Sequence, residues 1–486
     1  MRNVLAIALV FMFGTCAARG QDDERMQWLA LQKAVQKTIQ HNETSIACII
    51  VSRSEYYGKR LNAYPGQLGG YDPDLIELDP RMSALERAQI LKKLNLADTN
   101  NVPSAFGSGV VVDAEGLILT NYHVVQDATK IFVRLPGGKS SYADIHAADA
   151  RADLAVLKLI GQVGPLKTIP LGDADKAERG QFVLTLSNPF AAGFRDGQPS
   201  ASWGILSNMR RRAPLNLKEE ERIRPFHHYP TLLQTDTRMH LGSSGGALLN
   251  MQGELIGLLS SMAAIQGGET PGGYALPVNA AMRRIIDVLK RGEEIDYGFL
   301  GISFDERQPE GQKGILLKSV GKGSPADGNL KEHKDILLAI NGQPIRDADD
   351  IYLHVATHLA GSKVRLLVRQ AGKERLVEVT LAKLRVPNKS IASSLGKRPF
   401  FRGVRVDWSS LLAQELGRPT LKGVLVTEVQ PNTAADRADL KTGDVILRVN
   451  QVEVPTPAAF YQTVAEARGP VELTIEANPP VKITLK

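Results

Sequence analysis

Short apolar runs, interrupted by Gly, Asn and Pro, fill the chain between residues 107 and 277. Runs such as KIFVRL, DLAVLKLI and GQFVLTLSN have the composition that β-strands prefer. The turn sequences Asp113–Gly116 and Met251–Gly253 stand between such runs and predict hairpins. This pattern predicts an all-β barrel or sandwich.

Helical patterns precede, interrupt and follow these strands. The stretch Asp23–Gln40 carries apolar residues at i, i+3 and i+4 and predicts an amphipathic helix, which the strand-like run Ile46–Val51 follows. Ser83–Glu86 has the pattern of a capping box and predicts a short helix inside the long polar connection 52–104. Ala280–Arg291 predicts a helix that closes the β-rich segment.

The C-terminal part of the chain contains an internal repeat. Residues 314–345 recur as 423–454, and matched residues such as Asp335 and Asp444 share one offset (444 − 335 = 109). Two copies at this spacing predict two small tandem domains, because a solenoid needs shorter repeats in larger number. The polar stretch Val386–Lys397 is predicted to link them.

The chain of 486 residues is too long for one domain, and its composition is that of a globular protein. The patterns predict a signal peptide over residues 1–20, a β-rich domain over 21–295, and repeat domains over 296–388 and 398–486.

Residues 1–20 have the features of a secretory signal peptide. Arg2 supplies a basic start, the apolar run Val4–Phe13 follows, and small residues allow cleavage after Ala18 or Gly20. The run is shorter than a spanning helix requires, so no stable membrane anchor is expected. The mature chain is predicted to be secreted across the inner membrane into the periplasm.

Charge and cysteine content narrow the function classes. The net charge of +7 falls to +5 (7 − 2 = 5) once Arg2 and Arg19 leave with the signal peptide, and it is spread thinly, which gives no case for nucleic acid. Removal of Cys16 leaves Cys48, which lies in the apolar run SIACIIVS and is predicted to be a buried packing residue. The histidines are scattered without ligand spacing, so no metal or cofactor is expected.

The pentad Gly242–Gly246 (GSSGG) has three interpretations: a flexible linker, the G-x-S-x-G elbow of α/β-hydrolases, or the nucleophile loop of a two-barrel serine protease. A linker is disfavoured because the pentad stands between strand-like runs. The elbow needs a helix after Ser244 and a downstream catalytic histidine. A strand–turn–strand pattern follows instead, and the downstream histidines lie within the repeats. The protease loop is therefore favoured.

His123 ends one strand-like run, Asp153 begins another, and with Ser244 they follow the chain order of the chymotrypsin class. A serine becomes a nucleophile when a neutral imidazole takes its proton and a buried carboxylate orients that imidazole. Gly242 and Ser244 are predicted to direct N–H groups at the forming oxyanion. Each residue alone is readily structural, so the prediction depends on their combination.

The runs FGSGVVVDAEGLILTNYHVV, ADLAVLKL, LSNPF, LLQTDTRMHLGSSGGALLN and GELIGL resemble the HtrA/Deg family of serine proteases, and the repeats resemble its PDZ domains. The resemblance covers almost the whole mature chain. It implies a mainly β fold, with a chymotrypsin-like double β-barrel followed by two PDZ-like α+β domains. It also implies the triad His123, Asp153 and Ser244, an oxyanion hole of Gly242 and Ser244, and a trimer-based homo-oligomer.

The nucleophile loop departs from the family pattern Pro-Gly-Asn-Ser-Gly-Gly. Leu241 replaces the proline and Ser243 the asparagine. Neither change removes a catalytic group, but the loss of proline's fixed φ is expected to leave the loop more mobile. The connection 52–104 corresponds to the family's regulatory loop and Met209–Tyr229 to its activation-sensing loop. We therefore expect a resting enzyme that is only partly competent.

In the first repeat, Tyr297–Ile302 resembles the loop whose backbone N–H groups hold the C-terminal carboxylate of a peptide, which then adds as a strand. The residues predicted to bind the peptide are Gly298, Phe299, Leu300, Gly301 and Ile302. In the second repeat, Phe401–Val406 has one glycine, and Arg405 is predicted to fall among the pocket positions. We therefore expect a poorer pocket there.

These features predict an extracytoplasmic serine endopeptidase that cleaves unfolded or misfolded proteins and whose activity the PDZ domains regulate. The alternative is a non-catalytic chaperone or peptide-binding scaffold with the same fold. The complete set of His123, Asp153 and Ser244 favours the enzyme.

Overall fold

The computed structural model describes residues 25–57, 68–76, 78–212, 226, 229, 231–260, 273–304, 313–386, 391–393, 398–416, 422–477 and 479–486. The chain divides into two compact units. The first unit covers residues 1–146, 152–218 and 230–283, and the second covers 147–151, 219–229 and 284–486. The predicted signal peptide lies outside the described residues. Within the described ranges, no helix is long and apolar enough to cross a membrane.

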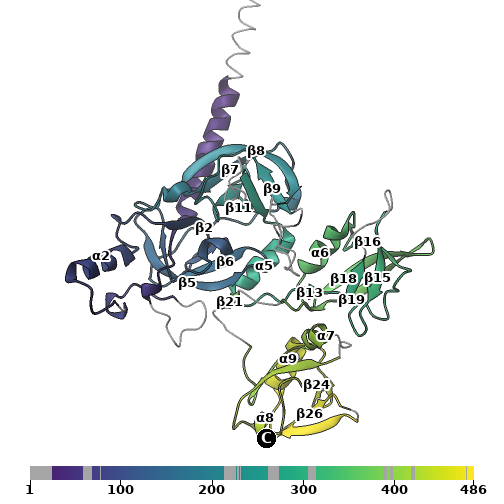
Figure 1. The fold of residues 1–486 in the computed structure, drawn as a ribbon. Helices are drawn as coiled ribbons and strands as arrows, with labels where there is room; N and C mark the ends of the chain where they lie inside the picture. Colours follow the sequence, from purple (N-terminus) through teal and green to yellow (C-terminus); the bar gives the residue numbers. More distant parts are fainter. Residues whose placement is uncertain are drawn as a thin grey trace, which may run out of the picture. The chain divides into compact units, whose positions relative to one another are not determined.

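An antiparallel barrel forms the first half of the first unit (Figure 1). Its strands are β1 (Ile46–Ser52), β2 (Ala105–Asp113), β3 (Leu117–Thr120), β4 (Lys130–Arg134), β5 (Ser140–Asp149) and β6 (Leu154–Leu159). They pair in the order β5-β4-β1-β2-β3-β6, and β5 also pairs with β6, which closes the barrel. The predicted hairpin is present: the Gly116 N–H donates to the Asp113 carbonyl at 3.2 Å.

A second closed barrel follows. Its strands are β7 (Phe182–Ser187), β8 (Ser200–Arg211), β9 (Leu232–Thr235), β10 (Ala247–Leu249), β11 (Leu255–Ser260) and β12 (Gly273–Pro277), paired in the order β10-β11-β12-β9-β8-β7. Val183, Leu206 and Leu248 are fully buried in its core. The turn Met251–Gly253 joins β10 to β11, as predicted. The prediction of a β-barrel segment is confirmed.

The predicted helices are present around these barrels. The first runs over residues 25–42. The helix α2 (Ala84–Leu94) begins at the predicted capping box, in which the Ser83 hydroxyl and the Glu86 carboxylate each accept the other residue's backbone N–H. The helix α5 spans Ala280–Lys290, and α3 is a single turn over Tyr122–Val125. Short 3₁₀ turns lie at η1 (Glu43–Ser45), η2 (Glu55–Tyr57), η3 (Pro73–Leu75), η4 (Ala174–Lys176) and η5 (Pro189–Ala191).

The second unit contains the two repeats. The first comprises β13 (Gly298–Phe299), β14 (Ile302–Phe304), β15 (Ile315–Val320), β16 (Ile336–Ile340), β17 (Gln343–Pro344), α6 (Ala348–Ala356), β18 (Lys363–Gln370), β19 (Lys373–Thr380) and β20 (Ala382–Lys383). The second comprises β22 (Val404–Trp408), α7 (Ser410–Leu416), β23 (Val424–Val429), α8 (Ala434–Arg437), β24 (Val445–Val449), β25 (Val452–Glu453), α9 (Pro457–Glu466), β26 (Val471–Ile475) and β27 (Val481–Leu485).

Both repeats have the same strand order, β14-β15-β16-β18-β19 in the first and β22-β23-β24-β26-β27 in the second. This agreement confirms the internal duplication read from the sequence. Inside the predicted linker Val386–Lys397, a short strand β21 (Ile391–Ser393) pairs with Ala147–Asp149. The linker is therefore partly structured.

Candidate active site

His123 and Asp153 are brought together by two neighbouring strands. The strands β3 and β6 pair antiparallel, with Thr120 opposite Ala155. His123 follows the end of β3, in the turn α3, and Asp153 directly precedes β6. As a result, His123 Nδ1 lies 2.9 Å from each carboxylate oxygen of Asp153.

The Asp153 carboxylate is buried and held in one orientation. The residue is 2% exposed, and its Oδ1 also accepts the His123 backbone N–H at 3.1 Å. Asn121 Nδ2 donates to the Asp153 carbonyl at 3.2 Å, and Asp153 has a φ of 52°, in the left-handed region that tight turns use. An imidazole that donates its Nδ1–H to a carboxylate keeps Nε2 as its basic atom. The arrangement therefore prepares His123 Nε2 to accept a proton.

Ser244 lies in the loop between β9 and β10, which packs closely against its surroundings. Gly242 and Gly245 have φ values of 92° and 83°. A Cβ at Gly245 would lie 2.1 Å from the Ser108 carbonyl oxygen, and a Cβ at Gly242 would lie 2.6 Å from the Asn188 carbonyl oxygen. Both positions need glycine for conformation and for space. The GSSGG sequence is thus a tightly packed turn, in which Ser244 is 3% exposed.

Two peptide groups of this loop are fixed through their carbonyls. The Leu241 carbonyl accepts the Phe190 N–H at 2.7 Å, and the Ser243 carbonyl accepts a backbone N–H within the turn at 3.0 Å. The N–H and C=O of a trans peptide group point in opposite directions. The N–H groups of Gly242 and Ser244 therefore point away from these two bonds. These are the two N–H groups that the sequence predicts as donors to the oxyanion.

The two residues that depart from the family pattern are accommodated by nearby contacts. Leu241 is half exposed, whereas Ser243 is buried and its Oγ accepts the His240 N–H at 3.2 Å and the Ser187 hydroxyl at 3.3 Å. The His240 ring stacks on Phe190, with 5.3 Å between ring centroids. Sequence analysis did not identify Ser187 or Phe190 as partners of this loop. Both lie in the quoted run LSNPF, but the fold alone places that run beside the loop.

The five residues predicted to bind a peptide fall into two groups. Gly298 and Phe299 form β13 and pair with β20. Leu300, Gly301 and Ile302 form the turn into β14, where Leu300 is 2% exposed and Gly301 has a φ of 82°. Gly298 is held in β13, opposite Lys383 of β20, and therefore lies outside the turn itself. The predicted carboxylate loop is thus narrowed to residues 300–302.

The second repeat has the same turn, but two residues away from the predicted alignment. The Gly301 carbonyl accepts the N–H of Gly321, the residue after β15, at 2.8 Å. In the same way, the Gly403 carbonyl accepts the N–H of Gln430, the residue after β23, at 2.8 Å. Gly403 is therefore the equivalent of Gly301. The prediction that Arg405 falls among the pocket positions is wrong. Arg405 Nε donates to the Arg398 carbonyl at 2.6 Å, and its guanidinium pairs with Glu428.

The edge of β22 in the second repeat already has a side-chain partner. Tyr461, on α9, accepts the Val406 N–H with its hydroxyl oxygen at 3.3 Å. The Tyr461 ring also meets the ring of Phe460, which is fully buried. A side chain of the repeat itself therefore occupies a backbone donor that an added peptide strand would use.

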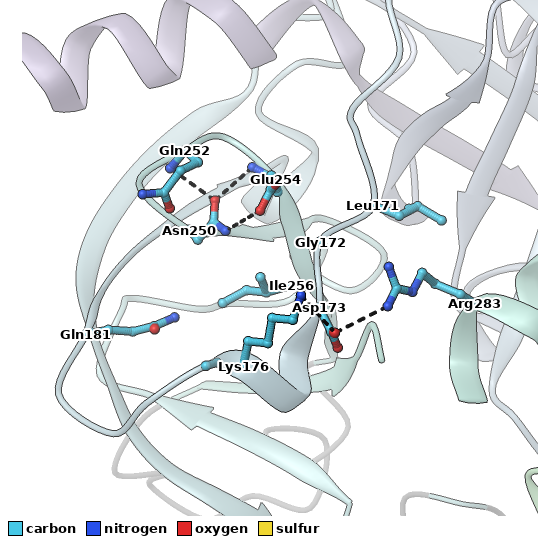
Figure 2. A pocket seen from close by; sticks show the side chains of 11 residues that line it. Leu171, Gly172, Asp173, Lys176, Gln181, Asn250, Gln252, Glu254, Ile256 and Arg283 are labelled. Carbon is cyan, nitrogen blue, oxygen red and sulfur yellow. Dashed lines mark hydrogen bonds and ion pairs between the residues drawn. The ribbon is translucent and has the colours of Figure 1, made fainter. Parts of the chain in front are cut away.

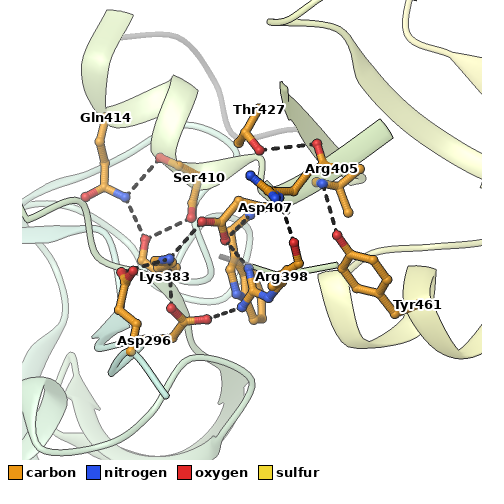
Figure 3. A network of polar contacts seen from close by, with 12 residues as sticks. Asp296, Lys383, Arg398, Arg405, Asp407, Ser410, Gln414, Thr427 and Tyr461 are labelled. Carbon is orange, nitrogen blue, oxygen red and sulfur yellow. Dashed lines mark hydrogen bonds and ion pairs between the residues drawn. The ribbon is translucent and has the colours of Figure 1, made fainter. Parts of the chain in front are cut away.

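A charge cluster around the buried Lys383 joins the two repeats (Figure 3). Lys383 Nζ lies 2.7 Å from Asp296 Oδ1 and 2.8 Å from Asp407 Oδ2, and its side chain is 4% exposed. Arg398 pairs with the same two carboxylates. Burial pushes the pKa of Asp407 upward, but Lys383 and Arg398 together hold that pKa below its usual range. The cluster ties β20 and the segment just before β13 to β22 of the second repeat.

Most of the predicted activation-sensing loop Met209–Tyr229 lies outside the described residues. Near its end, the Phe226 N–H donates to the Arg151 carbonyl at 2.8 Å. The Arg151 guanidinium lies over the rings of Phe226 and Tyr297, 4.9 and 4.6 Å from their centroids. Within the second unit, this end of the loop is therefore packed against the start of the first repeat.

Other candidate chemistry lies apart from this site. A polar pocket of about 350 Å³ on the second barrel (Figure 2) is lined by Leu171, Gly172, Asp173, Lys176, Ala177, Gln181, Asn250, Gln252, Glu254, Ile256 and Arg283. None of His123, Asp153 and Ser244 lines it. Across the described ranges, no three His, Cys, Asp or Glu side chains gather as a metal site would require. Cys48 is buried as predicted, and burial raises its pKa to about 12.

Comparisons with known proteins agree with this architecture. The sequence matches a trypsin-like peptidase domain over residues 107–258 and PDZ domains over residues 298–381 and 393–476. It is 32% identical over 380 residues to a probable periplasmic serine endoprotease DegP-like of Pseudomonas putida, covering 75% of each chain. It is also 32% identical over 379 residues to the periplasmic pH-dependent serine endoprotease DegQ of Escherichia coli, covering 76% of this chain and 77% of that protein. A solved structure of the HtrA-type protease AlgW with tripeptide is 24% identical, with a TM-score of 0.49, over 73% of this chain and 98% of that one.

Proposed function

The chain belongs to the HtrA/Deg family of serine endoproteases, and from this premise we propose that His123, Asp153 and Ser244 are its catalytic triad. The observation that carries the proposal is that one buried carboxylate forms two kinds of hydrogen bond with His123. Asp153 accepts from both the ring Nδ1 and the backbone N–H of His123. This arrangement fixes the ring orientation and tautomer that general-base catalysis needs.

In the proposed reaction, Ser244 Oγ attacks the scissile carbonyl while His123 Nε2 takes its proton. Asp153 remains ionised and stabilises the imidazolium, which then protonates the leaving amine. The N–H groups of Gly242 and Ser244 stabilise the negative charge of the tetrahedral intermediate. Cleavage of the C–N bond releases the amine and leaves an ester on Ser244. Water, which gives a proton to His123 Nε2, then attacks this ester, and the imidazolium returns the proton to Ser244 Oγ as the acid product leaves.

A serine-directed fluorophosphonate tests this assignment. We expect the mature protein to be labelled at Ser244 and to cleave casein, and Ser244→Ala to abolish both while the protein remains folded. Loss of a triad nucleophile costs on the order of 10⁶ in kcat. Undiminished casein cleavage by Ser244→Ala, with the fold intact by circular dichroism, would refute the triad.

For substrates, we propose unfolded or misfolded proteins, with peptides that have an apolar free C-terminus bound at the first PDZ domain. The support is the turn of residues 300–302, where Gly301 adopts a left-handed φ in front of the short strand β14. Successive backbone N–H groups in such a turn suit a carboxylate. The second PDZ domain serves in domain contacts, since Tyr461 and the charge cluster already engage β22.

We further propose that the protein acts in the periplasm, as its curated relatives are named to do. Residues 1–20 would be removed on export, leaving the predicted domains 21–295, 296–388 and 398–486. A trimer-based homo-oligomer is proposed for the mature chain. Light scattering on the purified protein tests it, and a monomeric mass at micromolar concentration would contradict it.

A further inference from the structure

Ser108 contacts the nucleophile loop at two points. It lies in β2 and is fully buried. Its backbone N–H donates to the Ser244 carbonyl at 2.8 Å, and its hydroxyl donates to the Gly242 carbonyl at 2.6 Å. The same hydroxyl oxygen accepts the Asn188 N–H at 2.7 Å. A serine hydroxyl has one proton to donate. In the bond with Asn188 the backbone N–H of Asn188 is the donor, so the hydroxyl proton of Ser108 is left for the bond to the Gly242 carbonyl.

The bond to Gly242 fixes the peptide group between the two proposed oxyanion donors. Three successive carbonyls, those of Leu241, Gly242 and Ser243, are all hydrogen-bonded. The outer two accept backbone N–H groups, whereas the middle one accepts the side chain of Ser108. The middle peptide group is also the one whose orientation changes most easily, because glycine at position 242 has a wide range of accessible φ and ψ angles. Its orientation sets the angle between the N–H groups of Gly242 and Ser244.

We propose that Ser108 is a positioning residue for the oxyanion hole: its hydroxyl holds the Gly242 peptide so that both N–H groups converge on the forming oxyanion. The proposal rests on the proposed triad and oxyanion hole. Ser108 does not touch the reacting atoms, and it acts through Gly242.

The N–H of the same peptide group, on Ser243, donates to the His240 carbonyl at 3.0 Å. Without the Ser108 hydroxyl, the buried Gly242 carbonyl loses its donor, and this bond alone restrains the peptide group, which then samples other orientations. Activity falls by the fraction of molecules that lose a formed hole. Loss of one oxyanion donor costs about 10²–10³ in kcat, so misplacement of the pair should cost about 10- to 100-fold. Substrate binding, which does not use the hole, should change little, and so should the pH dependence of kcat/KM.

The test compares Ser108→Ala with Ser45→Ala in the full mature chain. Ser45 is a matched control, since it is also fully buried, in the turn η1 that precedes β1, and its Oγ has no hydrogen-bond partner among the described residues. The measurements are kcat and KM on a peptide substrate, the pH profile of kcat/KM, the rate of fluorophosphonate labelling, and the melting temperature. Ser108→Cys, which keeps a weak donor of similar size, replaces Ser108→Ala if the latter does not fold.

We expect Ser108→Ala to lower kcat and the labelling rate about 10- to 100-fold, with KM within about threefold and an unchanged pH midpoint. Ser45→Ala should match the wild type. Unchanged kcat in Ser108→Ala, a rise in KM alone, or a loss equal to the fraction unfolded would overturn the proposal. A wild-type protein that is not labelled at Ser244 would instead overturn the triad, so the two failures are distinguishable.

Discussion

At Asp153, several interactions meet in one residue. The carboxylate accepts two hydrogen bonds from His123, the carbonyl accepts one from Asn121, and the backbone adopts a left-handed φ of 52°. A non-glycine residue holds such a conformation where its surroundings compensate the strain. These contacts explain how the carboxylate is held at 2.9 Å from the imidazole.

Asp153→Asn should leave the fold intact and lower kcat by about 10⁴, because an asparagine amide holds His123 in the wrong tautomer. Steady-state kinetics on a peptide substrate measures the loss. Asp113→Asn, at the half-buried end of β2 in the same barrel, is the control and should retain activity. A loss of less than about tenfold in Asp153→Asn would argue against its role in the triad.

At the scale of the elements, the turn that leads into β14 is where the proposed capture of a peptide C-terminus can be tested by a single substitution. Gly301 has a φ of 82°, and a Cβ there would lie 2.1 Å from Ser324 Cβ. Its carbonyl accepts the Gly321 N–H at 2.8 Å, which fixes the end of the turn. The turn therefore has no space for a larger residue, and its backbone N–H groups depend on glycine.

Gly301→Ala should weaken binding of a peptide with an apolar C-terminus by at least about tenfold, since the alanine both strains the backbone and displaces Ser324. Gly328→Ala is the matched control: Gly328 also has a positive φ, 74°, but a Cβ there meets no atom within 4 Å. Titration calorimetry on the full chain measures both. Amidating the peptide C-terminus should also weaken binding, and equal binding of acid and amide would contradict carboxylate capture.

At the scale of the whole molecule, the second unit is held together by charge as well as by apolar contacts. Lys383 is almost fully buried between Asp296 and Asp407, and Arg398 completes the cluster. The pKa of Asp407 is lowered from its usual value of 3.8 in the folded protein. The stability from this carboxylate is therefore present above about pH 3.8 and is lost as pH falls through the lower, folded-state pKa.

Lys383→Met should destabilise the docking of the two repeats by about 2 kcal/mol, because it leaves the half-buried carboxylates of Asp296 and Asp407 without their ammonium partner. The melting temperature and hydrogen exchange across β22 in the full chain measure this. Lys363→Met is the control, since Lys363 pairs with Glu378 at the exposed surface and should contribute less than about 1 kcal/mol. Equal effects of the two substitutions would show that the cluster does not join the repeats.

The sequence by itself determined the features that depend on local pattern or on self-similarity. Alternating apolar runs and turn residues predicted the β-barrels, and the offset between Asp335 and Asp444 predicted the paired domains. The order of His123, Asp153 and Ser244 was sufficient to propose a triad. These signals are readable because periodicity, turn chemistry and chain order are properties of neighbouring residues or of repeated segments.

The tertiary structure alone decided which distant residues support the site. Ser108, Asn188 and Phe190 reach the nucleophile loop only because the strands carrying them pack beside it, and nothing in their local sequence indicates that contact. The alignment of the second repeat was likewise misplaced by two residues, since side-chain type suggested one register and the carbonyl bonds of Gly301 and Gly403 require another. Hydrogen bonds across such distances depend on how whole elements pack, and that information is absent from any single stretch of the chain.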